Sequence, residues 1–584
     1  MGNRSSTSVS NSPLGIGDYF RDAGVRETVE SVVVAVMLAL LFKAFEAEAF
    51  VIPTGSMAPT LQGQHKDVVC PKCGFRYRVN ASLESREAKR IVETTCPICR
   101  YTQRLNDTKN WNQDTFSGDR ILVSKFAYDV AEPNRWDVIV FRYPDNAKQN
   151  YIKRLTGLPN ERLLIESGDL HVWNPPEDAP EAFADDRSQF SIVRKPPRKL
   201  LSMLQLVDDT NYLPPELVKV DWPLRWQDWS ATSDQQTWTA DLASGSPVYT
   251  IAPHPQLNWL RYRHLVPRRT EWTEISAGRL PKRMNNPQGE LISDYYEYND
   301  YGYELTTATE YKRNKVYDSE PIPHWVGDLV LDANIKLDSN EGTLFLECLE
   351  GGIKFTCAID VKTGAATVSA DSDRVRFDQA DGSEGSPSTV AQGQTSVRGG
   401  RSYRVRYGNV DDRIYLWINN RVVEFDLPMT FRREGSVLPE WSDSNPGDAE
   451  PLGIGAQNLS MSVDRLRVWR DIYYIGSPGV LNSDYRNFSG SVRDILQTPQ
   501  RWATSQDMFR SRERDPKDSF LLLDDQFFAL GDNSPASSDA RAWVGHHYVE
   551  RENLVGKALF VYWPHSWWSP IPFLPNFKRM GFIR

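Results

Sequence analysis

One hydroxyl group is a candidate for chemistry in the stretch FVIPTGSMAPTLQG, which occupies residues 50–63 and follows the most apolar run of the chain. It belongs to Ser56, which lies between Gly55 and Met57 with a proline on either side. A serine attacks a carbonyl only when a base removes its proton and nearby donors hold the charge that develops. No histidine is close in sequence, so Ser56 is either a turn residue or a nucleophile with another base.

A lysine can be that base when burial disfavours its ammonium form and lowers its pKa towards the working pH. The stretch YIKRL places Lys153 near the apolar residues Ile152 and Leu155. Strand alternation would direct Lys153 and Tyr151 to one face of a sheet, and Ile152 and Arg154 to the other. Most lysines on strands are solvated, so this pattern alone is weak evidence for a base.

Four cysteines form a second chemical pattern, CPKC followed by CPIC with 22 residues between them. Two Cys-x-x-Cys pairs can present four thiolates to one tetrahedral Zn²⁺. The alternative is two disulfides, because an extracytoplasmic compartment would permit them. The predicted ligands of a structural zinc ion are Cys70, Cys73, Cys96 and Cys99.

The elements that must position these groups are mainly β-strands. The chain has 584 residues, too many for one compact core, and a formal net charge of −9. Because no basic stripe accompanies that charge, a nucleic-acid partner is not expected. Alternating β-branched and aromatic residues predict an antiparallel β domain that begins near residue 50, with a long insertion inside it.

The N-terminus predicts a disordered cytoplasmic tail over 1–24 and a membrane helix over 25–49. Its uncharged stretch, residues 31–42, has only 12 residues, while a span needs about 20. The full range of residues 25–49 is long enough to span a membrane if Lys43 and the flanking glutamates extend to the membrane–water interface. A cleaved signal peptide is the alternative. A retained helix would place the remaining chain outside the cytoplasm, on a single-pass protein of the cell membrane.

The rest of the chain divides by composition and pattern. The predicted parts are a catalytic domain in two pieces, 50–172 and 518–584, with a cysteine-bearing ribbon insert at 67–104, and a large insertion over 173–517. Within the insertion we expect an irregular Pro/Trp-rich β region at 173–320, a β-sandwich of jelly-roll type at 321–475 and a return segment at 476–517.

Several motifs in one order resemble the conserved segments of type I signal peptidases, which are membrane-anchored serine/lysine endopeptidases. They are PTGSMAPTL, DRILVSK, RWDVIVFRYP, YIKRLTGLPNERL and LGDNSPASSDARAW. The resemblance covers about 25–172 and 518–564. It implies cleavage of signal peptides from exported preproteins at Ala-x-Ala-like sites, with signal peptides and membrane lipid as partners and no cofactor for catalysis.

Residue by residue, the resemblance makes Ser56 the nucleophile and Lys153 the general base. It makes the Ser56 N–H and the Thr54 hydroxyl the donors that hold the oxyanion. It makes Ser537 the residue that orients the lysine by a hydrogen bond. The other residues it implies are a structural ion pair, Asp539 and Arg541, and a substrate pocket of Phe50, Ile52 and Ile152. Asp532 and Asn533 are expected only to form a turn.

The segment 321–475 loosely resembles a laminin-G or concanavalin-type sandwich. Such sandwiches bind sugars or proteins, and others are spacers, so a glycan or protein ligand and a spacer role both stay open. A second hypothesis for the whole chain is a non-enzymatic surface binding protein on a decayed peptidase scaffold. A self-cleaving repressor of the related serine/lysine class is a third, but the chain lacks a helix-turn-helix pattern.

Overall fold

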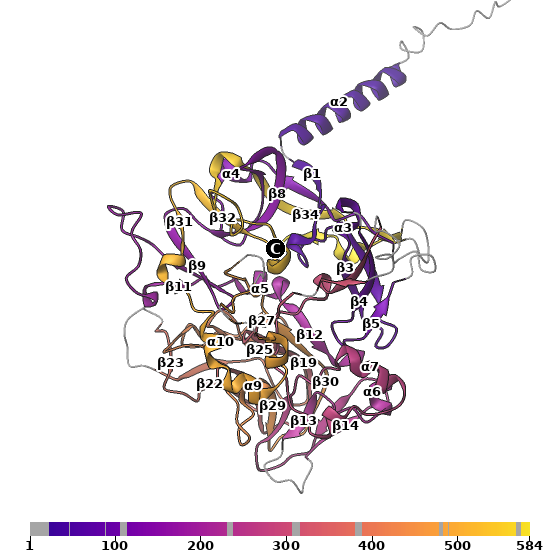
Figure 1. The fold of residues 1–584 in the computed structure, drawn as a ribbon, viewed down its shortest axis with the longest axis vertical. Helices are drawn as coiled ribbons and strands as arrows, with labels where there is room; N and C mark the ends of the chain where they lie inside the picture. The colour runs from indigo at the N-terminus through magenta and orange to yellow at the C-terminus, as the bar shows by residue number, and fades with distance from the viewer. Residues whose placement is uncertain are drawn as a thin grey trace, which may run out of the picture.

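The structure is a computed structural model that describes residues 23–45, 47–87, 89–105, 114–229, 237–306, 316–319, 321–379, 388–477, 483–486, 488, 490–567 and 574–584. Nearly all of the tail expected at 1–24 lies outside these residues. The described chain is mainly β and all its paired strands are antiparallel, which confirms this part of the predicted fold class. In Figure 1 the two ends of the chain form the upper part of the molecule, and the insertion forms the lower part.

The sheet that carries the candidate dyad is built from both ends of the chain. Its strand order is β1-β6-β34-β7-β8-β32-β33, and β37 pairs with β34. The C-terminal strand β34 therefore lies between two N-terminal strands. The bounds are β1 (Ala47–Val51), β6 (Arg120–Ser124), β7 (Val138–Tyr143), β8 (Asn146–Gly157), β32 (Gln526–Leu530), β33 (Val549–Glu550), β34 (Leu554–Trp563) and β37 (Gly581–Phe582).

A second sheet, in the order β11-β10-β9-β31, marks where the insertion leaves and returns. Both β10 and β31 pair with β9, so the two ends of the insertion start from neighbouring strands. All six residues of β9 are buried, as expected for a strand covered on both faces. The bounds are β9 (Glu161–Glu166), β10 (Asp169–Trp173), β11 (Ser191–Ile192) and β31 (Phe520–Leu522).

The insertion contains a sandwich of two sheets, with orders β14-β15-β30-β19-β25-β26-β27 and β13-β16-β29-β20-β21-β22-β24. Strand β12 pairs with β30, and the apolar side chains of both sheets form one large core. The bounds of these strands are β12 (Gln205–Asp209), β13 (Trp226–Trp229), β14 (Trp238–Asp241), β15 (Val248–Ile251), β16 (Asn258–Tyr262), β19 (Leu329–Leu337), β20 (Thr343–Glu350), β21 (Ile353–Asp360), β22 (Ala365–Ala370), β24 (Val390–Gln394), β25 (Ser402–Asn409), β26 (Ile414–Ile418), β27 (Arg421–Val422), β29 (Leu452–Gln457) and β30 (Met461–Arg470).

The predicted boundary between an irregular region and a sandwich at residue 321 is wrong. Strands β12 to β16 lie before that boundary, and each belongs to one of the two sandwich sheets. These strands are four or five residues long, too short for alternation to identify them with confidence from sequence. Strands β12 and β15 pair with β30, and β16 pairs with β29, about 200 residues or more later in the chain, while β13 and β14 extend the sheets by pairing with β16 and β15.

The cysteine-bearing insert is two hairpins that join the rest of the molecule. The first pairs β2 (His65–Val69) with β3 (Arg76–Asn80). The second, β4 (Lys89–Thr95) with β5 (Thr102–Arg104), continues into insertion strands β17 (Tyr301–Leu305) and β18 (Tyr317–Asp318). The insert at 67–104 is therefore no separate ribbon, because the large insertion completes its sheet.

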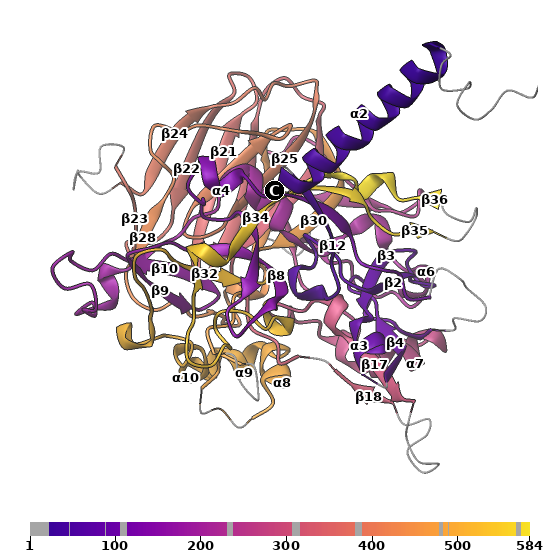
Figure 2. The same ribbon diagram turned by 90° about the horizontal axis from the view of Figure 1, so that it is seen from above.

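Helices are short except for α2 (Ala23–Phe45), which covers most of the predicted 25–49 segment. In Figures 1 and 2 it extends away from the body of the molecule. Among the described residues, no helix has both the length and the apolar character needed to cross a membrane. The other helices are α3 (Ser82–Arg86), α4 (Ala127–Val130), α5 (Pro197–Met203), α6 (Pro215–Lys219), α7 (Trp272–Ser276), α8 (Val492–Leu496), α9 (Pro499–Thr504) and α10 (Gln506–Arg510).

Candidate active site

Ser56 and Lys153 are in contact, although they lie in separate elements of the fold. Ser56 lies in the single 3₁₀ turn η1 (Gly55–Met57), just after β1, and Lys153 lies in β8. The Nζ atom of Lys153 is 2.8 Å from Oγ of Ser56 and donates a hydrogen bond to it. Both residues are nearly closed to solvent, with exposures of 6% for Ser56 and 4% for Lys153. The fold thus brings a serine and a lysine into contact across 97 positions of sequence.

Burial changes the acid–base behaviour of Lys153. It lowers the pKa of the Lys153 amine to about 8, from an ordinary value of 10.5, because the ammonium form loses its hydration. The nearby Asp539 carboxylate opposes this shift and the Arg541 guanidinium adds to it. A minor fraction of the amine is therefore already neutral at pH 7 and most of it above pH 8, and a neutral amine can accept the proton of the Ser56 hydroxyl.

The remaining residues expected on this side of the site surround the serine turn. Thr54 is half-buried and immediately precedes η1, and its side chain makes no capping hydrogen bond. Phe50, Ile52 and Ile152 belong to one apolar cluster, in which Ile52 is buried and the other two are half-buried. The three side chains implied as pocket wall therefore lie together, next to the serine.

Strand β1 leads into the serine turn and ends the sheet. It pairs with β6 on one side, and no other described strand pairs with its second side. An unpaired edge offers N–H and C=O groups to which an extended peptide can add as a further strand. The arrangement can therefore present a peptide bond to a buried serine–lysine pair.

The segment that carries Ser537 lies behind the dyad. Arg541 binds Asp539 through two hydrogen bonds of 2.7 Å, and Asp539 accepts a third from the N–H of Gly531 at 3.0 Å. Lys153 donates to Ser56 and to the carbonyl of Ile152, but no hydrogen bond joins it to Ser537. The Ser537 hydroxyl is buried without a hydrogen-bond partner among the described residues, so the expected orienting contact is not formed here.

Asp532 and Asn533 do more than form a turn. Arg154, the neighbour of Lys153, is fully buried and makes two hydrogen bonds of 2.7 Å to Asp532. Asn533 donates its backbone N–H to the carbonyl of Ser56 and its side-chain amide to the carbonyl of Gly55, both at 3.0 Å. Strand alternation predicted that Arg154 and Lys153 point to opposite faces of the sheet. No nearby residue in the sequence identified Asp532 as the partner of Arg154.

Two residues of the large insertion also support the serine turn, one beside Gly55 and one through Asn533, and no sequence pattern pointed to them. Asn299 exchanges two side-chain hydrogen bonds with Asn533, of 2.6 and 3.0 Å. Tyr298 is fully buried, and a Cβ atom on Gly55 would overlap its ring. The space beside Gly55 is therefore filled by the insertion and is not open to a substrate strand. Both residues belong to η7 (Glu297–Asn299).

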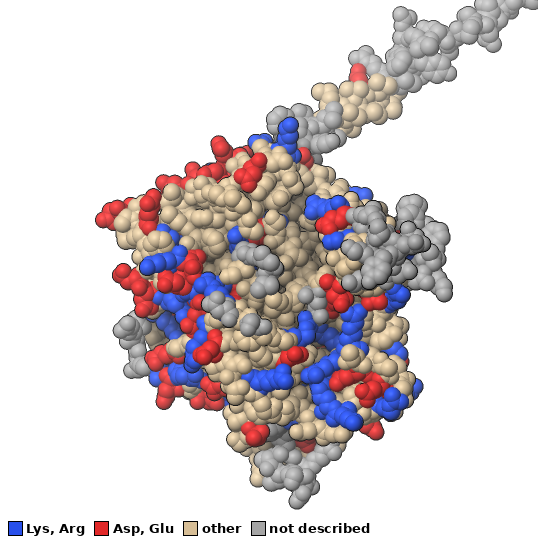
Figure 3. Space-filling model, viewed as in Figure 1, with Lys and Arg blue, Asp and Glu red and all other residues tan. Residues whose placement is uncertain are grey.

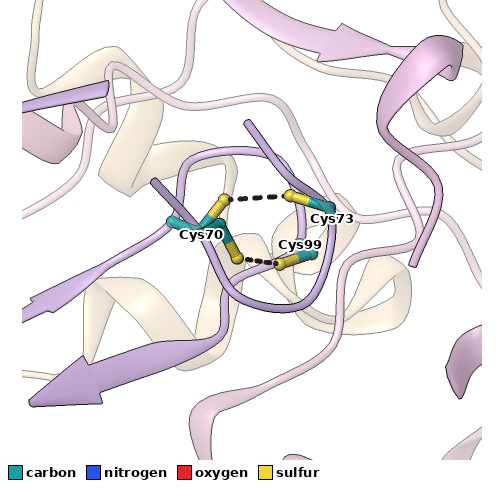
Figure 4. A group of neighbouring side chains, drawn as sticks. Cys70, Cys73 and Cys99 are labelled. Carbon is teal, nitrogen blue, oxygen red and sulfur yellow. Dashed lines mark hydrogen bonds between the residues drawn. The ribbon is translucent and has the colours of Figure 1, made fainter. Parts of the chain in front are cut away.

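The four N-terminal cysteines lie at the tips of the two hairpins and face one another (Figure 4). The Sγ atoms of Cys70 and Cys99 are 3.5 Å apart, as are those of Cys73 and Cys96, and all four lie within 4.8 Å of one another. The thiols are free, so the disulfide alternative is not the arrangement found. Four thiolates bound to zinc at about 2.3 Å would lie slightly less than 4 Å apart, so this donor set fits a tetrahedral zinc ion.

A second group of metal-ligating side chains is already engaged in hydrogen bonds. His65 Nε2 and His565 Nδ1 are 3.1 Å apart, and His565 Nε2 is 2.8 Å from Asp67. Asp67 also accepts a hydrogen bond from the indole of Trp567 at 2.7 Å. This chain joins the first cysteine hairpin to the C-terminal part of the molecule.

Comparison with protein families gives a match to the family described as "Signal peptidase, peptidase S26", over residues 98–216 and 482–563. These ranges contain Lys153 and the segment from Asp532 to Arg541. They do not contain Ser56. The matched regions are similar to signal peptidases.

Curated relatives are similar over short stretches. Signal peptidase I of Bacillus caldolyticus is 38% identical over 89 residues, which are 15% of this chain and 48% of that protein. Signal peptidase I of Pseudomonas aeruginosa is 46% identical over 72 residues, 9% of this chain and 25% of that protein. A probable signal peptidase I-2 of Synechocystis is 24% identical over 151 residues, 25% of this chain and 44% of that protein. The chain thus spans less than half of each of these relatives.

Solved structures are similar to this chain only loosely. A carbohydrate binding module from Bacillus subtilis has a TM-score of 0.21 and 8% identity, covering 41% of this chain and 93% of that chain. A galectin of Caenorhabditis elegans has a TM-score of 0.16 and 9% identity, covering 24% of this chain and 81% of that chain. These scores are too low to assign the sandwich to either fold family.

Proposed function

We propose that this chain is a membrane-bound type I signal peptidase, a serine endopeptidase with a Ser56/Lys153 dyad. The observation that carries the proposal is the 2.8 Å contact between the Lys153 amine and the Ser56 hydroxyl in a buried site. The similarity of residues 98–216 and 482–563 to signal peptidases supports the same activity.

In the proposed reaction, neutral Lys153 takes the proton of Ser56 while the serine oxygen attacks the scissile carbonyl. The backbone N–H of Ser56 and the hydroxyl of Thr54 hold the oxyanion that forms. Protonated Lys153 then donates to the departing amine, and an ester links Ser56 to the signal peptide. Water, deprotonated by Lys153, hydrolyses that ester and restores the dyad.

Specificity in this proposal comes from the apolar wall beside the serine. Phe50, Ile52 and Ile152 form shallow surfaces that accept Ala or Gly and exclude larger side chains by overlap. The unpaired edge of β1 holds the signal peptide as an added strand. The substrates are therefore exported preproteins with Ala-x-Ala-like sites.

The proposal includes a single-pass anchor formed by α2, with the peptidase on the extracytoplasmic side and lipid as a partner. Support comes from the exposed apolar side chains along α2, among them Val32, Val34 and Met37. Alkaline extraction of cell membranes tests it, because an integral anchor keeps the chain in the membrane pellet. A glycan or protein ligand of the sandwich belongs to the proposal as a further partner.

We also propose that Cys70, Cys73, Cys96 and Cys99 hold one structural Zn²⁺. The bound ion would cross-link the tips of the two hairpins and take no part in catalysis, which needs no cofactor. Metal analysis of the purified protein tests this stoichiometry directly.

The decisive experiment offers a preprotein with an Ala-x-Ala site to the full chain purified in detergent. Ser56→Ala and Lys153→Met are each expected to abolish cleavage. Lys148→Met is the matched control, because Lys148 is an exposed lysine of the same strand β8 and should retain full activity. Cleavage that persists in either dyad variant would refute the mechanism, and an inactive wild type would favour the non-enzymatic binding protein.

A further inference from the structure

A cavity of about 410 Å³ lies where the second cysteine hairpin meets the large insertion. Three distant stretches of the chain line it: residues 95–100, residues 264–300 and residues 493–497. Its volume falls within the range of small-molecule sites, about 300–1,000 Å³. The charged side chains in its lining are Arg100, Arg268, Arg269, Arg493, Glu290, Asp300 and Asp494.

Two of these arginines form no direct ion pair among the described residues, although Glu290 interacts with the charge of both. The Nε atoms of Arg100 and Arg268 are buried and have no hydrogen-bond partner among the described residues. Neither guanidinium forms an ion pair within the described chain, whereas Arg269, at the rim, is paired with Glu93 at 2.7 Å. Both arginines line the cavity, so their guanidinium donors other than Nε can bind an anion that enters it.

The backbone at Arg100 adds an independent argument. Arg100 follows the second Cys-x-x-Cys with a φ of 56°, and the same place after the first pair is taken by Gly74, with a φ of 75°. Both N–H groups bond back to the first cysteine of their pair, so the two turns are equivalent. Glycine adopts this left-handed conformation without strain and arginine does not. Arg100 thus has a backbone conformation that favours glycine. Its guanidinium lies over the ring of Tyr295, 3.4 Å from the ring centre.

The acidic groups of the cavity are engaged elsewhere. Glu290 forms an ion pair with Arg283 at 3.1 Å, and Asp300 accepts a hydrogen bond of 2.8 Å from Tyr295. Asp494 is exposed on α8. Burial raises the pKa of Glu290 to about 7, opposed by the charges of Arg283, Arg268 and Arg100, so Glu290 is partly uncharged at neutral pH. Four arginines and three carboxylic acids line the cavity, so its excess charge is positive.

Basic side chains are numerous on the surface of the lower half of the molecule, with acidic side chains among them. Figure 3 shows Lys and Arg side chains gathered in a band across the lower half of the face, where Figure 1 places α7 and α9. A positive rim raises the local concentration of anions and guides them inward.

We infer that this cavity is a binding site for a small anionic molecule, about the size of a monosaccharide, whose phosphate or carboxylate group bonds to Arg100 and Arg268. Guanidinium groups suit this chemistry because their planar N–H donors match oxyanions in bidentate geometry. The apolar side chains of Val266, Leu291 and Leu496 would contact the uncharged part of the ligand.

The test uses calorimetric titration of the full chain with three probes: glucose 6-phosphate, glucuronate and glucose. We expect one or both anions to bind and glucose not to bind. Changing Arg100 and Arg268 together to Gln should weaken anion binding by about tenfold or more, the loss typical of charge-assisted hydrogen bonds. Arg279→Gln is the control, because it removes an exposed positive charge close to the cavity but not in its lining.

The two anions separate the sources of the oxyanion, because binding of one alone identifies a phosphate or a carboxylate ligand. Equal binding of glucose, no binding of either anion, or unchanged affinity in the double variant would overturn the inference. Thermal unfolding checks that the variants are folded. If the double variant is not, Arg268→Gln and Arg268→Lys are compared, and the lysine should retain part of the affinity. Binding is measured directly, so the result does not depend on peptidase activity.

Discussion

In the proposed mechanism Lys153 acts only in its neutral form, and its environment sets the pH at which that form appears. Burial of the amine outweighs the attraction of Asp539 and brings the pKa of Lys153 to about 8. The same desolvation makes the site dry, which strengthens every electrostatic interaction with the developing oxyanion.

The rate of the proposed peptidase should therefore rise with pH. Below pH 8 the amine is protonated and cannot accept the Ser56 proton, so kcat/KM should increase through an apparent pKa of about 8 and then level off. The measurement is kcat/KM against pH for wild type on a preprotein substrate. A profile that is flat, or that rises only near the ordinary lysine pKa of 10.5, would contradict this role for Lys153.

The ion pair between Arg154 and Asp532 should contribute to the stability of the fold. Both are fully buried and joined by two hydrogen bonds, so removal of one charge leaves the other unpaired in the interior. Arg154→Ala should lower the free energy of unfolding by about 3–5 kcal/mol. Denaturant unfolding measures this, with Arg142→Ala on the exposed face of β7 as control. Equal effects in both variants would show that the pair does not stabilise the fold.

At the scale of elements, the serine turn is held from two directions. Asn533 fixes the carbonyls of Gly55 and Ser56, and η7 of the insertion fixes Asn533 through Asn299. The orientation of the Ser56 N–H, the proposed oxyanion donor, thus depends on a residue more than 200 positions away. Asn299 is a positioning residue, because it acts through Asn533 and does not touch the dyad.

Asn299→Ala should lower kcat by about tenfold and leave KM nearly unchanged, because it loosens the turn without altering the apolar pocket. The measurement is steady-state cleavage of a preprotein, with Asn286→Ala, an exposed asparagine of the same insertion, as the control. Asn299→Asp keeps the size of the side chain and reports whether the amide donor matters. An Asn299→Ala enzyme with normal kcat would exclude the positioning role.

Contacts between residues could be predicted from the sequence only where each residue lies in a distinctive motif. Lys153 and Ser56 could be paired from their motifs, because each lies in a short, distinctive stretch. The partner of Arg154 could not, because Asp-Asn is an ordinary turn signal and its burial depends on the fold. Asn299 carries no local signal at all. The same reason explains the missed strands β12, β15 and β16, whose pairing partners β29 and β30 are supplied by distant sequence.

At the scale of the whole molecule, the insertion is an integral part of the structure. It completes the sheet of the second cysteine hairpin through β17, and its side chains pack around the cysteines. Trp272 donates a hydrogen bond of 2.9 Å to the carbonyl of Cys99, and Arg225 donates one of 2.5 Å to the carbonyl of Ile98. The four-cysteine centre therefore lies in a junction that joins three parts of the chain.

Removal of metal should consequently loosen the insertion as well as the hairpins. Chelation, or Cys96→Ser with Cys99→Ser, is expected to remove one zinc per chain and to expose β17 and residues near Trp272 to hydrogen exchange. Cys348→Ala, at a buried cysteine of the sandwich, is the control and should keep the metal. A protein that contains no zinc as purified, or whose exchange is unaffected by metal loss, would contradict this role.

The order of strands in the first sheet has a consequence for biosynthesis. Strand β34 sits between β6 and β7, and β32 lies beside β8, the strand of Lys153, yet both are made last. A ribosome adding about 5–20 residues per second needs on the order of tens of seconds to pass from β8 to β34. Until then the lysine has no closed sheet around it and stays hydrated and protonated. If the proposed function is correct, the nascent chain is inactive until its final strands are made.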